Sequence, residues 1–302
     1  MKTLRLSGLA MAVAVGLGGA ASATELTIAI VNNGHMINMQ KVAEAYTKDT
    51  GVKLNWVSLE EGVLREQVTS DTATGGGQYD IINIGMQEAP IWGAAGWIEP
   101  LNFGASYDVN DMLPAIRNGL SHNGTLYAAP FYGESSMVMY RKDLTDAAGV
   151  SVRDNDTWSN IKAAAAAIHN PDAGVYGACL RGKPGWGDNM AFLTTMANSF
   201  GAQWFNEDWT PALDSPAWNH AVNFYVDMLT KYGPPGSEGN SFNEILALIN
   251  EGKCGMWIDA TIAASFVTNP AQSKVHDKMA FAQSPVAVTK RGANWLWAWA
   301  MA

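Results

Sequence analysis

Two stretches of the sequence bring together the kinds of side chain that bind a small polar molecule. Residues 128–141 (AAPFYGESSMVMYR) place the ring of Tyr132 and the carboxylate of Glu134 between two apolar runs that alternate at strand period. Residues 181–188 (RGKPGWGD) combine a guanidinium, an indole and a carboxylate, and their glycines allow the backbone to approach a ligand closely. We therefore expect the chain to cross between two lobes at 128–141 and to bind a small molecule in the cleft, where such sites preferentially occur.

Tryptophans supply a second recurring feature. Trp295, Trp297 and Trp299 alternate with other residues, so a strand would present all three indoles on one face. Three indoles are bulky for an ordinary core, and a cleft wall is the favoured interpretation. Trp257 precedes Asp259 by two residues, so both side chains can lie on the same side of a strand; a purely structural core position for Trp257 is the alternative.

Catalytic and cofactor motifs are absent from the sequence. The five histidines are scattered, with no HExxH pattern and no carboxylates at metal-ligand spacing. GESSM at residues 133–137 lacks the second glycine of a nucleophile elbow, and the glycines at 182, 185 and 187 match neither a phosphate loop nor a dinucleotide fingerprint. Carboxylates are plentiful, but none stands out as half of a catalytic pair. We expect no cofactor and no metal.

The first half of the chain alternates strand and helix patterns. Strands are predicted at 26–31, 53–59 and 79–84, with helices at 36–50 and 63–74. This order predicts a mostly parallel α/β lobe, which binds ligands beyond the carboxyl ends of its strands. Those ends carry Asn32, Asn33, Glu60, Glu61, Gln87 and Glu88.

After the crossing the pattern is mainly helical. Strands are expected at 175–180 and 254–258, and residues 279–285 are interpreted as a strand that returns to the first lobe. Helices are expected at 142–148, 159–169, 189–200, 217–232 and 242–250.

The amino terminus predicts export. Lys2 and Arg5 precede a short apolar run, and Ala21-Ser22-Ala23 forms a cleavage signal, so residues 1–23 are expected to be a signal peptide. Removing 23 of the 302 residues leaves 279, enough for two lobes, and removing its two cations changes the net charge from −9 to −11. An acidic exported chain is a poor candidate for binding nucleic acid or an anionic membrane surface.

The chain has two cysteines, Cys179 and Cys254. An oxidising compartment favours a disulfide between them, with two buried free thiols as the alternative. No histidines are spaced to complete a zinc site with them.

Several long stretches resemble one protein family. VNNGHM at 31–36, GGGQYDIINIG at 75–85, LYAAPFYGESSMVMYRKDL at 126–144, GKCGMWIDATIAASFVTNP at 252–270 and NWLWAWAMA at 294–302 together resemble family 1 extracellular solute-binding proteins of ABC importers, and more closely the sorbitol/mannitol-binding subfamily. The resemblance covers essentially all of the exported chain. In that family a helical region follows the position of Ala302, so we expect a carboxyl-terminal portion to be missing here.

The resemblance implies a type II-like periplasmic-binding-protein fold with two α/β lobes joined by crossing strands. The first lobe would comprise residues 24–133 and 279–302, and the second residues 134–278. It also implies a periplasmic, monomeric binding subunit that closes around a sugar alcohol and delivers it to a membrane permease, with no catalysis.

A linear polyol alternates hydroxyl and CH groups, so its site needs charged hydrogen-bond partners and flat apolar faces. Candidates for hydroxyl contacts are Arg181, Asp188, Asp259 and Glu134, with Asn32, Arg65 and Gln87 from the first lobe. Candidates for stacking are Trp186, Trp257, Trp297, Trp299 and Tyr132. A purely structural role is the alternative for several of them. Arg65 could lie on a solvent-exposed helix face, Glu134 could stabilise the hinge without touching the ligand, and Arg181 could pair with Asp188.

Other functions stay open from the sequence. The same fold could bind a monosaccharide or a disaccharide, or hand its ligand to a sensory receptor. An exported carbohydrate-active enzyme could also place carboxylates and tryptophans in a cleft, but it would need two carboxylates at a defined separation, one of them with a raised pKa.

Overall fold

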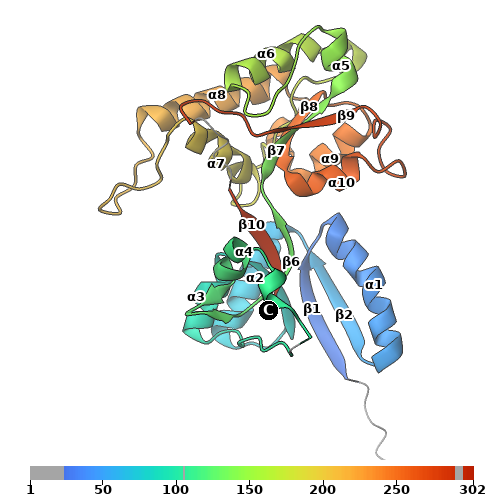
Figure 1. The fold of residues 1–302 in the computed structure, drawn as a ribbon, viewed down its shortest axis with the longest axis vertical. Coiled ribbons are helices and arrows are strands. Elements are labelled where there is room, and N and C mark those ends of the chain that lie inside the picture. Colours follow the sequence, from blue (N-terminus) through green and yellow to red (C-terminus); the bar gives the residue numbers. More distant parts are fainter. Residues whose placement is uncertain (1–23, 105, 290–294) are drawn as a thin grey trace, which may run out of the picture.

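The computed structural model describes residues 24–104, 106–289 and 295–302. The predicted signal peptide, residues 1–23, lies outside these ranges. The described chain forms two lobes, one above the other, with narrow strand connections between them (Figure 1).

The first lobe is built on a five-stranded sheet of order β2-β1-β3-β10-β6. Its strands are β1 (Glu25–Val31), β2 (Lys53–Leu59), β3 (Ile81–Gly85), β6 (Ala129–Glu134) and β10 (Trp297–Met301). β1 pairs in parallel with β2 and β3, as the alternating pattern predicts, while β10 is antiparallel to both β3 and β6. The sheet is therefore mixed. Its buried residues, such as Ile30 and Ile84, form the core of this lobe.

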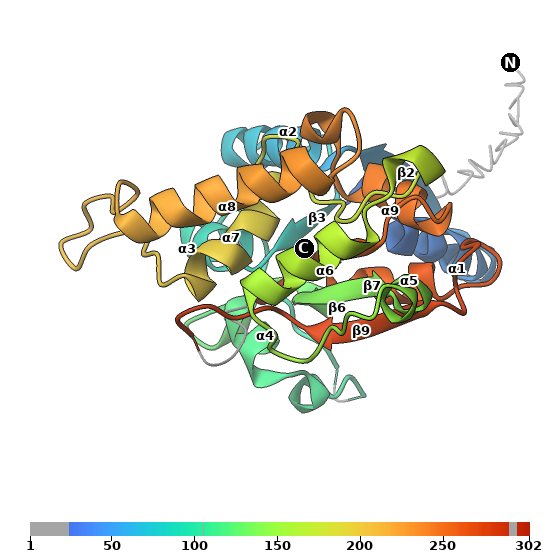
Figure 2. The same ribbon diagram turned by 90° about the horizontal axis from the view of Figure 1, so that it is seen from above.

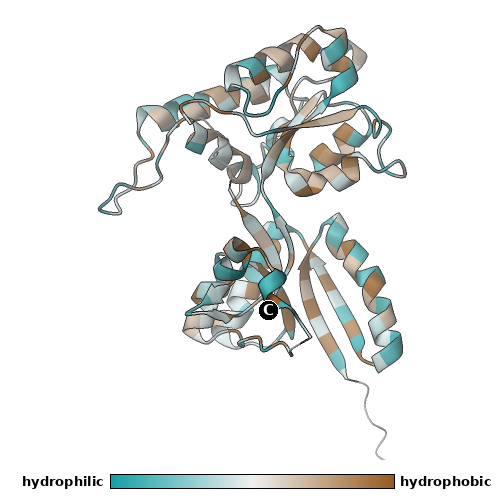
Figure 3. Ribbon diagram, in the orientation of Figure 1, coloured by the Kyte–Doolittle hydropathy of each residue, from teal (hydrophilic) through white to brown (hydrophobic). Residues whose placement is uncertain are grey.

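Helices flank this sheet. They are α1 (Gly34–Thr50), α2 (Glu61–Thr74), α3 (Glu88–Ala95), α4 (Pro114–Gly119) and the 3-10 turn η1 (Val109–Asp111), with a small hairpin of β4 (Ser121–His122) and β5 (Thr125–Leu126). The Asn33 side chain caps α1, and the Glu60 carboxylate caps α2. Both caps follow directly on a strand, so they fix polar groups at the carboxyl edge of the sheet. Hydrophobic residues mark β1 and β2 and recur along α1 (Figure 3).

The second lobe contains a three-stranded antiparallel sheet of order β8-β7-β9. Its strands are β7 (Ser136–Arg141), β8 (Met256–Ala260) and β9 (Met279–Gln283). Its helices are α5 (Lys142–Ala147), α6 (Trp158–Ile168), α7 (Asn189–Ser199), α8 (Pro216–Tyr232), α9 (Phe242–Asn250) and α10 (Ala264–Val267), with 3-10 turns η2 (Pro171–Ala173), η3 (Ser237–Gly239) and η4 (Thr261–Ala263). Figure 2 shows α6 and α8 covering this lobe. Trp158 is fully buried in its main core.

Two predictions about this lobe are wrong. β9 pairs with β7 along its whole length, so residues 279–283 belong to the second lobe's sheet and not to the first lobe. The chain stays with this lobe as far as Thr289: the backbone of Val286 pairs with residues 156–158, and the backbone N–H groups of Val288 and Thr289 donate to the Ser199 carbonyl. Residues 175–180 do not form a strand; their backbone makes isolated bridges to Asn170, Cys254 and Trp257.

Within the described ranges, one strand connection passes between the lobes. β6 of the first sheet continues through Ser135 into β7 of the second, which is the crossing that the sequence predicts. The segment that leads into β10, the return segment, is described from Trp295 onward, and the Ser135 hydroxyl donates to the Trp295 carbonyl at 2.5 Å. Ser135 also exchanges hydrogen bonds with Thr261, at 2.7 and 3.1 Å. The crossing strand is thereby tied to both the return segment and the end of β8.

Cys179 and Cys254 form a disulfide with their Cα atoms 5.9 Å apart. It joins the segment before residue 181 to the turn that begins β8. Both sulfurs are buried beside Trp257, so the link lies directly behind the wall of the second lobe that faces the first.

Candidate functional site

A cavity of about 550 Å³ lies between the lobes, at the carboxyl ends of β1 and β2 and beside the β6–β7 crossing. Its volume is within the ordinary range for small-molecule sites. Polar and charged side chains from both lobes line it, together with indole and phenyl rings. The polar lining residues are Asn32, Asn33, His35, Glu60, Glu61, Tyr132, Glu134, Thr194, Arg181, Lys183, Asp188, Ser241, Asn243 and Glu244.

Arg181 and Asp259 form a buried ion pair at the second-lobe side of the cavity. Their exposed fractions are 6% and 3%. Arg181 donates from Nε and Nη2 to the two oxygens of Asp259, at 2.8 and 2.5 Å, and from Nη1 to the carbonyl of Gly187. Asp259 also accepts from the indole of Trp257 at 2.8 Å. Burial lowers the pKa of Arg181, but the adjacent Asp259 charge outweighs it, so the pKa is raised and the guanidinium stays charged.

Two of the five N–H groups of Arg181 have no partner among the described residues. They belong to the two neighbouring terminal nitrogens, and Arg181 lines the cavity. A guanidinium held in this way offers a planar pair of donors to two adjacent oxygens of a ligand.

Glu134 ends β6 at the floor of the cavity. Among residues of the described ranges, none donates a hydrogen bond to its carboxylate. Burial raises the pKa of Glu134 to about 8, opposed by the Arg181 charge and reinforced by the charges of Asp259 and Glu61. An unpartnered carboxyl group close to neutrality can either donate or accept at a ligand hydroxyl.

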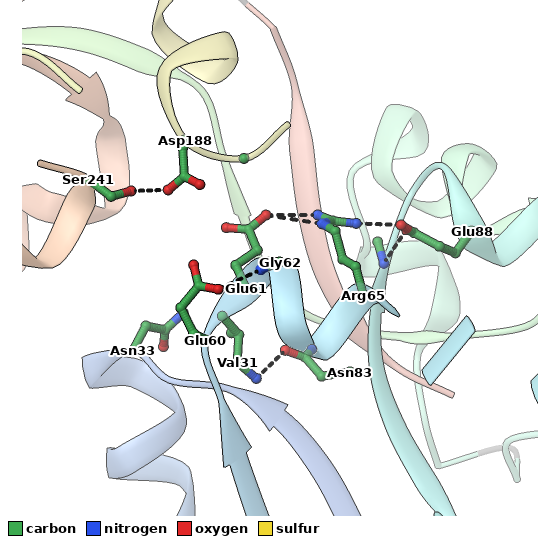
Figure 4. A network of polar contacts seen from close by, with 12 residues as sticks. Val31, Asn33, Glu60, Glu61, Gly62, Arg65, Asn83, Glu88, Asp188 and Ser241 are labelled. Atoms are coloured by element: carbon green, nitrogen blue, oxygen red, sulfur yellow. Dashed lines mark hydrogen bonds and ion pairs between the residues drawn. The ribbon is translucent and has the colours of Figure 1, made fainter. Parts of the chain in front are cut away.

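Asp188 lines the cavity from the second lobe. Figure 4 shows it accepting a hydrogen bond from the hydroxyl of Ser241, the residue that caps α9. Lys183 approaches the other oxygen of Asp188 at 3.7 Å and reaches across to Glu60 of the first lobe at 2.7 Å. The predicted alternative that Arg181 pairs with Asp188 is therefore wrong; Arg181 pairs with Asp259.

Arg65 points from α2 between two carboxylates of its own lobe, Glu61 at 3.0 Å and Glu88 (Figure 4). Its guanidinium carbon also lies over three indoles, 3.9 Å from the ring centre of Trp186, 4.9 Å from Trp299 and 5.2 Å from Trp297. These three tryptophans thus surround the planar guanidinium of Arg65. We call Trp186, Trp297 and Trp299 the aromatic wall.

The structure brings most of the predicted site residues together. The cavity is lined by Asn32, Tyr132, Glu134, Arg181, Trp186, Asp188, Trp297 and Trp299. Trp295 lines it as well, so the alternating indoles do form a cleft wall.

Four predicted contact residues do not line the cavity. Asp259 and Trp257 lie behind Arg181, and Trp257 is fully buried in the second lobe's core. Arg65 lies behind the aromatic wall. Gln87 is exposed at the start of α3, because the chain turns away from the cavity directly after β3.

Sequence reasoning missed several lining residues. The ring of His35 packs against Tyr132 of its own lobe and Phe266 of the other, with centroids 5.4 and 4.7 Å apart. Burial lowers the pKa of His35, so its imidazole is neutral. Asn33 donates to the Tyr132 hydroxyl at 2.9 Å. The position of Asn33, Glu60 and Glu61 after strands was a usable signal; for Phe266 the sequence offered none.

Two absences hold for the residues that the structure describes. No group of three or more His, Cys, Asp or Glu side chains there could hold a metal ion. None of the helices in those ranges has the length and apolar character needed to cross a membrane.

Two lobes, a strand crossing and a polar, tryptophan-lined cavity between them define a two-lobed ligand-binding protein of the periplasmic binding type. Residues 33–301 match the family of bacterial extracellular solute-binding proteins. The chain belongs to this family.

Relatives within the family are close in sequence and structure. The chain is 51% identical over 285 residues to a mannitol-binding protein of Pseudomonas aeruginosa, covering 94% of this chain and 65% of that relative. It is 56% identical to an ABC transporter solute-binding protein of Agrobacterium vitis S4 whose crystal structure contains D-mannitol, with a TM-score of 0.90 and coverage of 92% and 68%. A ribitol complex from Agrobacterium radiobacter K84 is 25% identical, with a TM-score of 0.85 and coverage of 92% and 71%.

Proposed function

We propose that this protein is the periplasmic binding subunit of an ABC importer that captures a linear sugar alcohol of the mannitol or sorbitol type. The single observation that carries the proposal is the interlobe cavity, in which a fixed guanidinium and an unpartnered carboxyl group face a wall of indoles. The mannitol-bound relative, at 56% identity, supports the same ligand class.

The side chains that line the cavity suit both the hydroxyl groups and the CH groups of a polyol. Arg181 offers two adjacent N–H donors, which suit the oxygens of a vicinal diol. Glu134 and Asp188 offer carboxyl oxygens, and Asn32 an amide. Trp186, Trp297 and Trp299 present flat apolar surface to the CH edges of the chain. Asp259 and Trp257 act indirectly, because they hold Arg181 in place.

Ligand capture follows from the division of these groups between lobes. A polyol that contacts Arg181 of the second lobe and the indoles of β10 in the first stabilises the arrangement in which both face one cavity. The ligand shifts the protein toward that closed arrangement only by its higher affinity for it. A membrane permease is the proposed recipient, and the binding subunit acts as a monomer without catalysis.

Calorimetry on the chain without its first 23 residues tests this proposal. We expect D-mannitol, sorbitol or ribitol to bind, while glucose, fructose and maltose do not. A ligand at a hundred times its dissociation constant should add about 2.7 kcal/mol of stability, so a thermal-shift scan checks the same ranking. Arg181→Lys keeps the charge but loses the planar fork and should weaken binding at least about tenfold. The matched control is Arg153→Lys, on an exposed residue outside the cavity. A folded protein that binds a saccharide and no polyol would refute the assignment.

A further inference from the structure

The two lobes meet at the amino-terminal end of α2, beside the cavity. There the second-lobe loop carries Trp186 and Gly187 against Glu61 and Arg65 of the first lobe. We call these four residues the interlobe latch. Trp186 lines the cavity, but Arg65 does not.

The charge of Arg65 is held by its own lobe. Glu61 and Glu88 accept hydrogen bonds from its guanidinium, and Trp297 and Trp299, also of the first lobe, lie along it. Of the contacts of Arg65, one crosses the cleft: its guanidinium carbon lies 3.9 Å from the ring centre of Trp186. Trp186 also packs edge-to-face on Trp297 of the first lobe, with the ring centres 4.8 Å apart. Trp186 is 50% exposed even here, so little else in its own lobe covers it.

Gly187 provides an independent sign of close fit. A Cβ atom at this position would lie 2.0 Å from Oε1 of Glu61, the oxygen that accepts from Arg65. A larger residue at this position would therefore push the Glu61 carboxylate away from Arg65. The Gly187 carbonyl also accepts from Arg181, so the loop that meets the first lobe is fastened to the cavity's central guanidinium.

We propose that Arg65 is a positioning residue that sets ligand affinity by holding the lobes closed through Trp186, without touching the ligand. This inference rests on the proposed function. Opening the cleft separates Trp186 from Arg65, while the contacts of Arg65 with Glu61, Glu88, Trp297 and Trp299 persist. The guanidinium is thus already held in place in the first lobe, and closing brings Trp186 of the 181–188 loop onto it.

Arg65→Met should raise the dissociation constant for D-mannitol and for ribitol by the same factor, about 5- to 30-fold, the range of a partly desolvated cation–π contact. Most of the change should appear in the dissociation rate, since the latch acts after closure. Arg65→Lys retains the charge but loses the flat face, so it should weaken binding in the same direction. Arg117→Met is the matched control, because the Arg117 guanidinium donates to Val109 and Asn110 of its own lobe.

A double-mutant cycle identifies the partner. If Arg65 acts through Trp186, then Arg65→Met should have almost no further effect on affinity in a Trp186→Ala background. Equal effects in both backgrounds would overturn the proposal. So would a loss confined to one of the two polyols, since that would make Arg65 a direct ligand contact.

A ligand-free measurement separates this proposal from the proposed function. The Asn243 side chain reaches the backbone of Asn32 across the cleft at 3.3 Å. Cysteines at these two positions, cross-linked by a short bis-maleimide, report how often the empty protein closes. We expect Arg65→Met to slow cross-linking several-fold relative to Arg117→Met. An unchanged rate overturns the latch even if polyols bind; a slowed rate supports it even if D-mannitol and ribitol fail to bind.

Discussion

Asp259→Asn tests whether the buried ion pair acts as one unit. Asp259 accepts from Arg181 twice, from the Trp257 indole and from the backbone of Ala260 at 2.6 Å. Asparagine has nearly the same shape and keeps an acceptor for Trp257, so the change removes mainly the charge. What remains is a buried guanidinium with 6% exposure and no directly bonded carboxylate.

The expected cost follows from that exposure. Removing one partner of a buried pair destabilises a protein by about 3–5 kcal/mol, because the other charge is left uncompensated. The negative charge of Glu61 offsets part of this, so we expect the low end, about 3 kcal/mol. For a protein of this size that corresponds to a fall in melting temperature of about 6–12 °C.

Denaturant unfolding of Asp259→Asn, Arg181→Met and the double variant measures the coupling. Each single change strands a buried charge, whereas the double change removes both, so the double variant should be no less stable than the weaker single. Polyol binding should fall in both singles, and Asp259→Asn should add nothing in the Arg181→Met background, since Asp259 acts through Arg181. Additive unfolding costs, or additive binding losses, would refute this reasoning.

Three further predictions concern Gly187 of the interlobe latch, Glu134 at the end of β6, and the disulfide. Gly187→Ala should weaken polyol binding several-fold in calorimetry, because its Cβ would lie 2.0 Å from Glu61 Oε1 and would displace that carboxylate from Arg65, while unfolding of the empty protein stays unchanged. The pKa of Glu134 is raised from 4.5 to about 8, so between these pH values the folded state holds a proton that the unfolded state releases. The free energy of unfolding, compared with that of Glu134→Gln, should therefore fall as the pH rises from 4.5 to about 8. In urea unfolding the fall should be at most about 5 kcal/mol. Replacing Cys179 and Cys254 by serine opens a loop of 75 residues and should cost about 4 kcal/mol, matched by treating the original protein with reductant.

Each of these has a contrary outcome. Normal affinity in Gly187→Ala would mean that the lobes need not approach as closely as here. A pH profile shared by the original protein and Glu134→Gln would place the titrating group elsewhere. Equal melting temperatures with and without reductant would show that the disulfide does not contribute to the stability of the second lobe.

Local periodicity was enough to predict much of the fold. The strand and helix alternation of the first half predicts the parallel pairing of β1, β2 and β3, because each element buries one face. The range 242–250 matches α9, whose capping box of Ser241 and Glu244 marks its start. The alternating tryptophans of β10 likewise point to one cavity, since strand period is independent of distant contacts.

Long-range pairing could not be predicted in the same way. β9 has the composition of any short strand, and nothing in its residues says that its partner is β7 rather than the first sheet. Arg181 lies seven positions from Asp188 but 78 from Asp259, its actual partner. Spacing favours the near carboxylate; only the packing of β8 beside residue 179 brings the far one into reach. The sequence therefore predicts which side chains belong to the site more reliably than it predicts which of them are hydrogen-bonded to each other.

The placement of the charges suggests how affinity and closure are divided. Each lobe fixes its own key cation internally, Arg181 through Asp259 and Arg65 through Glu61 and Glu88, so little ordering of these groups remains to be done when a ligand arrives. Polar and ionic contacts between the lobes beside the cavity are few and partly exposed, such as Lys183 with Glu60. Exposed pairs of this kind contribute at most about 1 kcal/mol. The interlobe ion pairs therefore do not hold the empty protein closed. Closure depends on the binding energy that the ligand adds to the contact between Trp186 and the proposed positioning residue Arg65.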